Sequence, residues 1–143
     1  MHKRFFNYLF IAVTLFSAIS TSQLISEEAD YLFYGRHLVV SFKECDFTAL
    51  NNANELRAAF MKALQASGAT CLGTCDYEFQ PNGYTMIALL SESHASIHTY
   101  PEFGSCFIDV FTCGTKCKNE DFIAVLANYL KPGKIEQSNI ERK

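Results

Sequence analysis

The sequence has no cluster of basic residues. Twelve Lys and Arg are dispersed among fifteen Asp and Glu over 143 residues, which gives a formal net charge of -3. Binding to a nucleic acid backbone depends on clustered positive charges that displace counterions, and this chain offers no such cluster. We therefore expect no nucleic acid partner.

Tryptophan, internal repeats and low-complexity tracts are also absent. The 13 Phe and 7 Tyr nevertheless make 14% of the chain aromatic, and 49% of its residues are hydrophobic. Disordered segments have too little apolar surface to offset the entropy of ordering, so this composition predicts a folded protein. A chain of this length can build one substantial core and is too short for two ordinary domains.

The N-terminal segment combines basic residues with an uncharged apolar run. Lys3 and Arg4 precede the 15 residues from Phe5 to Ile19, and small or polar residues follow as far as Ser22. This layout is typical of a signal peptide, and the run is short for a bilayer span, which needs about 20 residues. We expect residues 1–21 to be a signal peptide or membrane-anchoring leader that contacts a membrane through 5–19, with a linker at 22–34. A buried helix and a start site further along the chain are the alternatives.

The remaining residues predict strands and helices with short connections. An apolar run between Arg36 and Cys45 indicates a buried strand, and an apolar stripe with spacings of four indicates a helix from Asn51 or Asn52 to about Ala66. A second helix is predicted from about Asn119, ending at Pro132-Gly133. Segments rich in β-branched and aromatic residues, together with a weak one at the C-terminus, are expected to be strands: 69–80, 84–90, 95–100, 105–113 and 134–140.

These elements follow the order β-α-β-β-β-β-α-β. Four consecutive strands with short connections imply mostly antiparallel pairing. An apolar stripe on each helix must be buried against the sheet. We therefore predict an α/β fold, a two-layer sandwich of a mostly antiparallel sheet with two helices on one face.

A polar stretch separates two of the predicted strands. Between Ser91 and Glu102 the chain reads SESHASIHTYPE, which contains hydroxyl, carboxyl and imidazole groups. A solvated hairpin turn is the simplest interpretation of these residues alone. His94 and His98 are four residues apart, which suits a metal on a helix, but the surrounding residues alternate as in a strand. We expect no metal site here.

Four segments together resemble the prokaryotic S-adenosylmethionine decarboxylase proenzyme family. The resemblance extends from Gly35 to about Lys143, and its most specific part is SESH-x3-HT-x-PE followed by D-x-FTCG. It implies a decarboxylase-like domain at 35–143. The segments that carry it are GRHLVV at 35–40, FKECD at 42–46, SESHASIHTYPEFG at 91–104 and IDVFTCG at 108–114.

The resemblance implies that the chain cleaves itself between Glu92 and Ser93. The Ser93 hydroxyl would attack the Glu92 carbonyl, and elimination from the resulting ester would leave a pyruvoyl group at position 93. Such a group forms a Schiff base with the substrate amine and accepts the electrons released with carbon dioxide, in place of pyridoxal phosphate and without a metal. The implied reaction is decarboxylation of S-adenosylmethionine to the aminopropyl donor of spermidine biosynthesis.

The resemblance also implies roles for individual side chains. His98 would take the α-proton of the ester during processing, and Cys113 would donate a proton to the substrate carbon after decarboxylation. Phe79 would stack on adenine, and Glu102 would bind the ribose hydroxyls. The family usually has serine at the position of Thr85. Threonine keeps the hydroxyl for processing but carries it on a stiffer side chain.

The resemblance further implies a homodimer of cleaved protomers in which each active site uses both chains.

The six cysteines raise a conflict about compartment, because an even number after a leader suggests disulfides in an exported protein. Cys113 must instead remain a free thiol, and S-adenosylmethionine belongs to the reducing cytoplasm. We expect a cytoplasmic protein from the chemistry, with an exported or membrane-anchored protein as the alternative from the leader.

Two other functions remain open. One is a diverged pyruvoyl-dependent decarboxylase of ornithine or arginine, although Phe79 and Glu102 favour a nucleoside. The other is an exported, non-catalytic binding domain held together by disulfides.

Overall fold

A computed structural model describes residues 33–143. The leader predicted at 1–21 and most of the linker predicted at 22–34 lie outside the described residues. Within residues 33–143, no helix is long and apolar enough to cross a membrane.

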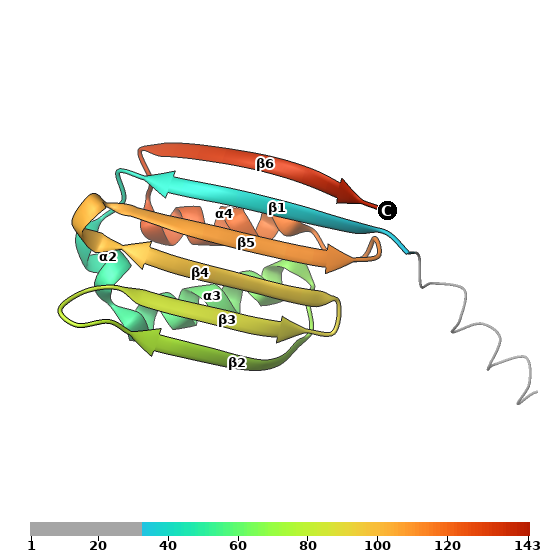
Figure 1. The fold of residues 1–143 in the computed structure, drawn as a ribbon, viewed down its shortest axis with the longest axis horizontal. Coiled ribbons are helices and arrows are strands. Elements are labelled where there is room, and N and C mark those ends of the chain that lie inside the picture. The colour runs from blue at the N-terminus through green and yellow to red at the C-terminus, as the bar shows by residue number, and fades with distance from the viewer. Residues whose placement is uncertain (1–32) are drawn as a thin grey trace, which may run out of the picture. The chain divides into compact units, whose positions relative to one another are not determined.

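Six strands form a single sheet in the spatial order β2-β3-β4-β5-β1-β6 (Figure 1). Every neighbouring pair is antiparallel, which confirms the pairing expected from the short connections. The first strand therefore lies in the interior of the sheet, between β5 and β6. The strands are β1 (Gly35–Lys43), β2 (Cys71–Glu78), β3 (Tyr84–Leu90), β4 (Ser93–Tyr100), β5 (Ser105–Cys113) and β6 (Lys134–Arg142).

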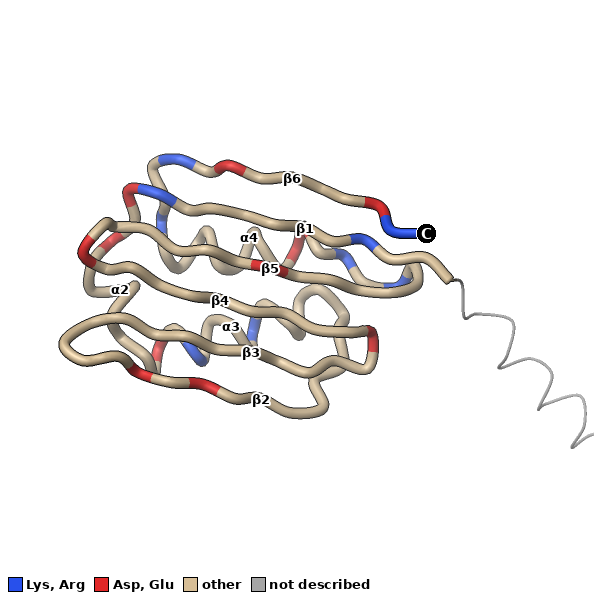
Figure 2. Tube along the Cα trace, viewed as in Figure 1, with Lys and Arg blue, Asp and Glu red and all other residues tan. Residues whose placement is uncertain are grey.

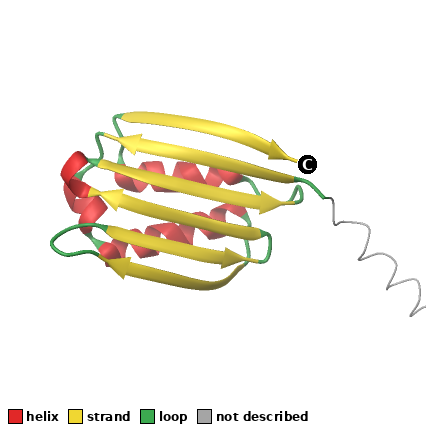
Figure 3. Cartoon of the chain, viewed as in Figure 1, coloured by secondary structure: helices red, strands yellow, loops and turns green. Residues whose placement is uncertain are grey.

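Two long helices, α3 (Ala53–Ser67) and α4 (Asn119–Leu130), cover the same face of the sheet (Figures 1 and 3). The Asn52 side chain accepts a hydrogen bond from the Glu55 N–H at the start of α3, and Gly68 ends the helix in the left-handed conformation. The two-layer sandwich and the element order predicted from the sequence are confirmed. Two short elements were not predicted: helix α2 (Phe47–Asn51) and the 3₁₀ turn η2 (Pro101–Phe103).

The core lies between these helices and the inward side chains of the strands. Phe60 of α3 and Phe122 of α4 are fully buried and meet edge to face, with ring centroids 5.2 Å apart. Phe42, Ile97 and Ile108 project toward the helices from three adjacent strands and are also buried. Strand alternation therefore sends every second side chain of the central strands to the opposite face.

Replacing Phe122 by alanine is expected to lower the free energy of unfolding by about 3–5 kcal/mol, because the cavity would open at the centre of this core. Urea denaturation of the purified protein measures the change. Phe33 is 93% exposed and provides a matched control, so Phe33→Ala is expected to leave the unfolding midpoint in place. A Phe122→Ala midpoint equal to the control would contradict this assignment of the core.

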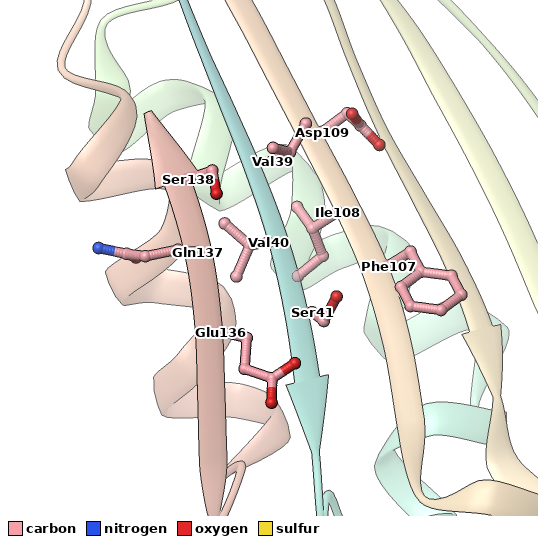
Figure 4. Close-up of a pocket in the computed structure, with 9 residues that line it drawn as sticks. All are labelled: Val39, Val40, Ser41, Phe107, Ile108, Asp109, Glu136, Gln137 and Ser138. Atoms are coloured by element: carbon pink, nitrogen blue, oxygen red, sulfur yellow. The ribbon is translucent and has the colours of Figure 1, made fainter. Parts of the chain in front are cut away.

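No helix within residues 33–143 covers the other face, which we call the open face (Figure 3). It carries exposed apolar side chains at its centre, including Ile87, Leu89 and Phe107, each at least 50% exposed. Strands β3 and β4 contain no Lys, Arg, Asp or Glu, as Figure 2 shows by their uniform colour. A shallow hollow of about 390 Å³ crosses β5, β1 and β6 on this face, with Ser41, Asp109 and Glu136 among its lining residues (Figure 4).

Candidate active site

The polar stretch of the sequence begins as the tight turn between β3 and β4. Ser91 and Glu92 form this turn, and both are tied to Thr70 in the segment that precedes β2. The Ser91 N–H donates to the Thr70 carbonyl at 2.9 Å, and the Thr70 N–H donates to Glu92 Oε2 at 2.9 Å. The interpretation of this stretch as a hairpin turn therefore holds for its first residues, and the turn is fixed from both sides.

The Glu92 carbonyl, on the N-terminal side of the predicted cleavage point, faces the end of β5. The Cys113 N–H donates to the Glu92 carbonyl oxygen at 2.8 Å. This contact follows from the register that pairs Ser93 with Thr112. A backbone donor on a carbonyl oxygen stabilises the negative charge that develops there when a nucleophile adds to the carbon. The chain therefore supplies a fixed donor to the one carbonyl that Ser93 would attack.

Ser93 occupies an unusual backbone conformation for a residue other than glycine. Its φ angle is 151°. Conformations of this kind cost on the order of 1–3 kcal/mol and persist only where surrounding structure holds them. The hydrogen bonds of the turn and the pairing of β4 with β5 provide that support. Strain is thus stored at the residue whose amide bond is predicted to break.

The residues around Ser93 form a group that we call the Ser93 cluster, made of Glu92, Ser93, His94 and Cys113. Ser93 Oγ lies 3.1 Å from His94 Nδ1. Cys113 is the last residue of β5 and is exposed. The structure therefore brings together the predicted cleavage residues and the predicted proton donor, and it adds His94, to which the sequence assigned no role.

A second group, the His98 cluster, consists of the predicted residues Phe79, Thr85 and His98 together with Tyr100, to which no role was assigned. Thr85 Oγ1 and His98 Nδ1 are 2.5 Å apart, and the two residues pair across β3 and β4. The His98 ring contacts Phe79 and Tyr100, with centroid distances of 5.6 and 4.6 Å. The Thr85 hydroxyl therefore lies within hydrogen-bond distance of the imidazole to which the family resemblance assigns a role in processing.

Glu102 lies just beyond the His98 cluster, in the η2 turn that follows β4. Its side chain is exposed, and Phe79 is 41% exposed in the connection between β2 and β3. Tyr77 has its ring 5.0 Å from that of Phe79. Both predicted substrate-binding side chains are therefore available to a ligand at this end of β4.

The two clusters lie at different points along β4. His98 lies five positions after Ser93 along the strand, a distance of about 16 Å at ~3.3 Å per residue. The turn that holds Glu92 and the η2 turn lie at opposite ends of the strand (Figure 1). Within one protomer, the structure therefore does not bring His98, Thr85, Phe79 or Glu102 to the Ser93 hydroxyl.

All six cysteines fall within residues 33–143, and all are free thiols. The Cys106 thiol donates a hydrogen bond that lowers the pKa of Cys45, and the same bond together with burial raises the pKa of Cys106. Burial and the nearby Glu92 carboxylate raise the pKa of Cys117.

In the described part of the chain, no group of three or more His, Cys, Asp or Glu side chains is arranged to hold a metal ion.

The family model for S-adenosylmethionine decarboxylase matches residues 36–143. The chain belongs to the S-adenosylmethionine decarboxylase family. It is 41% identical over 108 residues to an S-adenosylmethionine decarboxylase proenzyme of Methanococcus maripaludis, which covers 76% of this chain and 88% of the relative. It is 41% identical over 113 residues to S-adenosylmethionine decarboxylase proenzyme 2 of Bacillus cereus, covering 79% and 89% respectively.

A solved structure supports both the decarboxylase family and its fold. The crystal structure of the adenosylmethionine decarboxylase from Aquifex aeolicus superposes with a TM-score of 0.71 at 31% sequence identity. The match covers 76% of this chain and 89% of the Aquifex chain. The resemblance inferred from the four sequence segments is confirmed, and residues 1–35 precede the region that matches the decarboxylase family model.

Proposed function

We propose that this member of the S-adenosylmethionine decarboxylase family cleaves itself between Glu92 and Ser93 and decarboxylates S-adenosylmethionine, supplying the aminopropyl donor for spermidine biosynthesis. The observation that carries the proposal is the 2.8 Å hydrogen bond from the Cys113 N–H to the Glu92 carbonyl, next to the strained Ser93. A polarised carbonyl followed by a serine is the arrangement that an attack of Oγ on that carbonyl needs.

The residues of the Ser93 cluster fit a pyruvoyl group made from Ser93. The group supplies a ketone that binds the substrate amine and accepts the electrons released with carbon dioxide. Cys113 holds an exposed thiol beside position 93, where it can donate a proton to the substrate carbon. The same residue thus has two roles: its N–H serves processing, and its thiol serves turnover.

The proposal includes a homodimer in which the open faces of two protomers stack. An isologous two-fold axis that lies between the sheets and crosses the strands places the Ser93 cluster of one protomer over the His98 cluster of its partner. The two clusters of one protomer are about 16 Å apart along β4. In the dimer, the partner's His98 cluster would lie beside the Ser93 cluster, so that this separation no longer keeps the two groups apart. The exposed side chains of Ile87, Leu89 and Phe107 would be buried by the same contact.

Stacking also explains how Phe79 and Glu102 can contact substrate. Both belong to the His98 end of the protomer, so they would face the Ser93 cluster of the partner. An aromatic ring can stack on the adenine of S-adenosylmethionine and a carboxylate can accept hydrogen bonds from its ribose hydroxyls, whereas ornithine and arginine have neither an adenine ring nor ribose hydroxyls. The names of the relatives favour the same substrate over these amino acids.

Release of carbon dioxide from labelled S-adenosylmethionine, ornithine and arginine tests the substrate assignment. The purified protein is expected to act on S-adenosylmethionine, and Ser93→Ala is expected to be inactive. Because ring stacking contributes about 0.5–1.5 kcal/mol, Phe79→Leu is expected to raise KM by roughly 2- to 10-fold. The matched control is Phe47→Leu, a half-exposed ring on α2. Faster turnover of ornithine or arginine than of S-adenosylmethionine would contradict the proposal.

A further inference from the structure

The contact between Ser93 and His94 is not used by the function proposed above. His94 is the second residue of β4, and its exposed side chain projects onto the open face. Its Nδ1 atom lies 3.1 Å from Ser93 Oγ. His98 of the same chain lies five positions after Ser93 on β4, and its Nδ1 atom is within hydrogen-bond distance of Thr85 Oγ1 instead. Within residues 33–143 of one protomer, the imidazole in contact with the Ser93 hydroxyl is therefore that of His94.

Neighbouring rings define the setting of the His94 imidazole. Its centroid lies 5.7 Å from that of Phe111 and 6.3 Å from that of His37, both in edge-to-face arrangements. His37 Nε2 is 3.2 Å from Asp109 Oδ1, which links the ring to a carboxylate on β5. The Arg142 guanidinium carbon lies 4.4 Å above the Phe111 ring. The His94 ring therefore lies against rings from β5 and β1, and its neighbours His37 and Phe111 are themselves held by Asp109 and Arg142.

The reaction that forms the ester has two separate requirements. The carbonyl must be polarised, which the Cys113 N–H does, and the serine hydroxyl must lose its proton as it attacks. An imidazole acceptor at hydrogen-bond distance from the hydroxyl meets the second requirement. Ser93 therefore has a donor for its target carbonyl and an acceptor for its own proton within a single chain.

We propose that His94 is the general base of the first processing step, an inference that rests on the self-cleavage proposed above. The proton of Ser93 Oγ passes to His94 Nδ1 as the bond between Oγ and the Glu92 carbonyl carbon forms. The bond between that carbon and the Ser93 nitrogen then breaks, and the proton moves from the imidazole to the nitrogen, which is released as an amine. The step is an isomerisation of amide to ester and needs no co-reactant.

This assignment divides processing between two histidines. His94 acts on the hydroxyl of its own chain and forms the ester. His98 of the stacked partner then takes the α-proton, which starts the elimination. A chain that lacks His94 would stop as the amide, whereas a chain that lacks His98 would stop as the ester.

Hydroxylamine distinguishes these two states, because it cleaves an ester between residues 92 and 93 and leaves the amide intact. His94→Asn keeps an oxygen near the position of Nδ1 but cannot hold the proton, so its self-cleavage is expected to slow by about 10²- to 10⁴-fold. Intact mass after hydroxylamine treatment is expected to show one uncut chain for His94→Asn and two fragments for His98→Gln. Imidazole added to His94→Ala is expected to restore self-cleavage, which also shows that this variant is folded.

Three results would overturn the assignment to His94 alone, and a fourth would overturn the self-cleavage on which it rests. Self-cleavage of His94→Asn at the wild-type rate, or its accumulation as a hydroxylamine-sensitive ester, would overturn it and leave the proposed function in place. Failure of imidazole to restore His94→Ala while circular dichroism shows a native spectrum would do the same. A wild-type chain that never splits would overturn the self-cleavage itself, and the role of His94 with it.

Discussion

Cys113→Ser is expected to leave the protein correctly cleaved and almost inactive. The backbone N–H that donates to the Glu92 carbonyl remains in the variant, so fragments 1–92, less any leader that is removed, and 93–143 should still form. The thiol that protonates the substrate carbon is lost, and a general acid contributes about 10²- to 10⁴-fold to a rate. Mass spectrometry and carbon dioxide release, carried out on the same preparation, separate the two effects.

Cys75→Ser provides the matched control for this prediction. Cys75 is an exposed thiol on β2 and belongs to neither cluster. Its replacement is expected to preserve both cleavage and turnover. If Cys113→Ser decarboxylates S-adenosylmethionine at the wild-type rate, the thiol is not the proton donor. If Cys113→Ser remains a single chain, the side chain and not the backbone N–H supports processing.

Two inactive variants are expected to restore processing when they share a dimer. Ser93→Ala cannot form the ester but retains the His98 cluster, whereas His98→Gln retains the Ser93 cluster and stops as the ester. In a mixed dimer, His98 of the Ser93→Ala protomer lies over the Ser93 cluster of the His98→Gln protomer. Because that pairing unites all the required groups, the His98→Gln chain should complete its cleavage.

Co-expression of the two chains with different affinity tags, followed by intact mass measurement, tests this complementation. The fraction of the His98→Gln chain that ends in a pyruvoyl fragment should increase with an excess of the Ser93→Ala chain. Each variant expressed alone serves as its own control and should give no such fragment. Absence of the fragment from purified mixed dimers would show that the two clusters do not meet across the open faces.

The order of the elements could be predicted from the sequence because its signals are local. The spacing of Leu56, Phe60 and Leu64 indicated helix α3, and Gly68 and Pro132-Gly133 indicated the ends of helices. The position of β6 beside β1 could not be predicted. Its nine residues are all exposed, and its pairing joins segments about a hundred residues apart in the chain. Such a pairing depends on the whole fold and leaves no periodic pattern.

The candidate site could be predicted in its residue types but not in its geometry. The resemblance of SESH and FTCG to the decarboxylase family identified Ser93, His98 and Cys113. It implied that both chains build each active site, but it did not indicate which of the predicted residues belong to the partner's share of the site. The bond from the Cys113 N–H to Glu92 depends on the register between β4 and β5, and the approach of His94 to Ser93 is seen only in the folded chain. The histidine that follows Ser93 in the SESH motif was the one sequence signal for the contact between His94 and Ser93.

The mass of the purified wild-type chain tests the central claim most directly. Self-cleavage predicts two fragments, the second covering residues 93–143 and beginning with a pyruvoyl group, which lacks the nitrogen of Ser93 and has no free amine. Ser93→Ala should give one chain of full mass from the same expression. A wild-type protein that remains a single intact chain, or a second fragment that begins with an unmodified serine, would contradict the account.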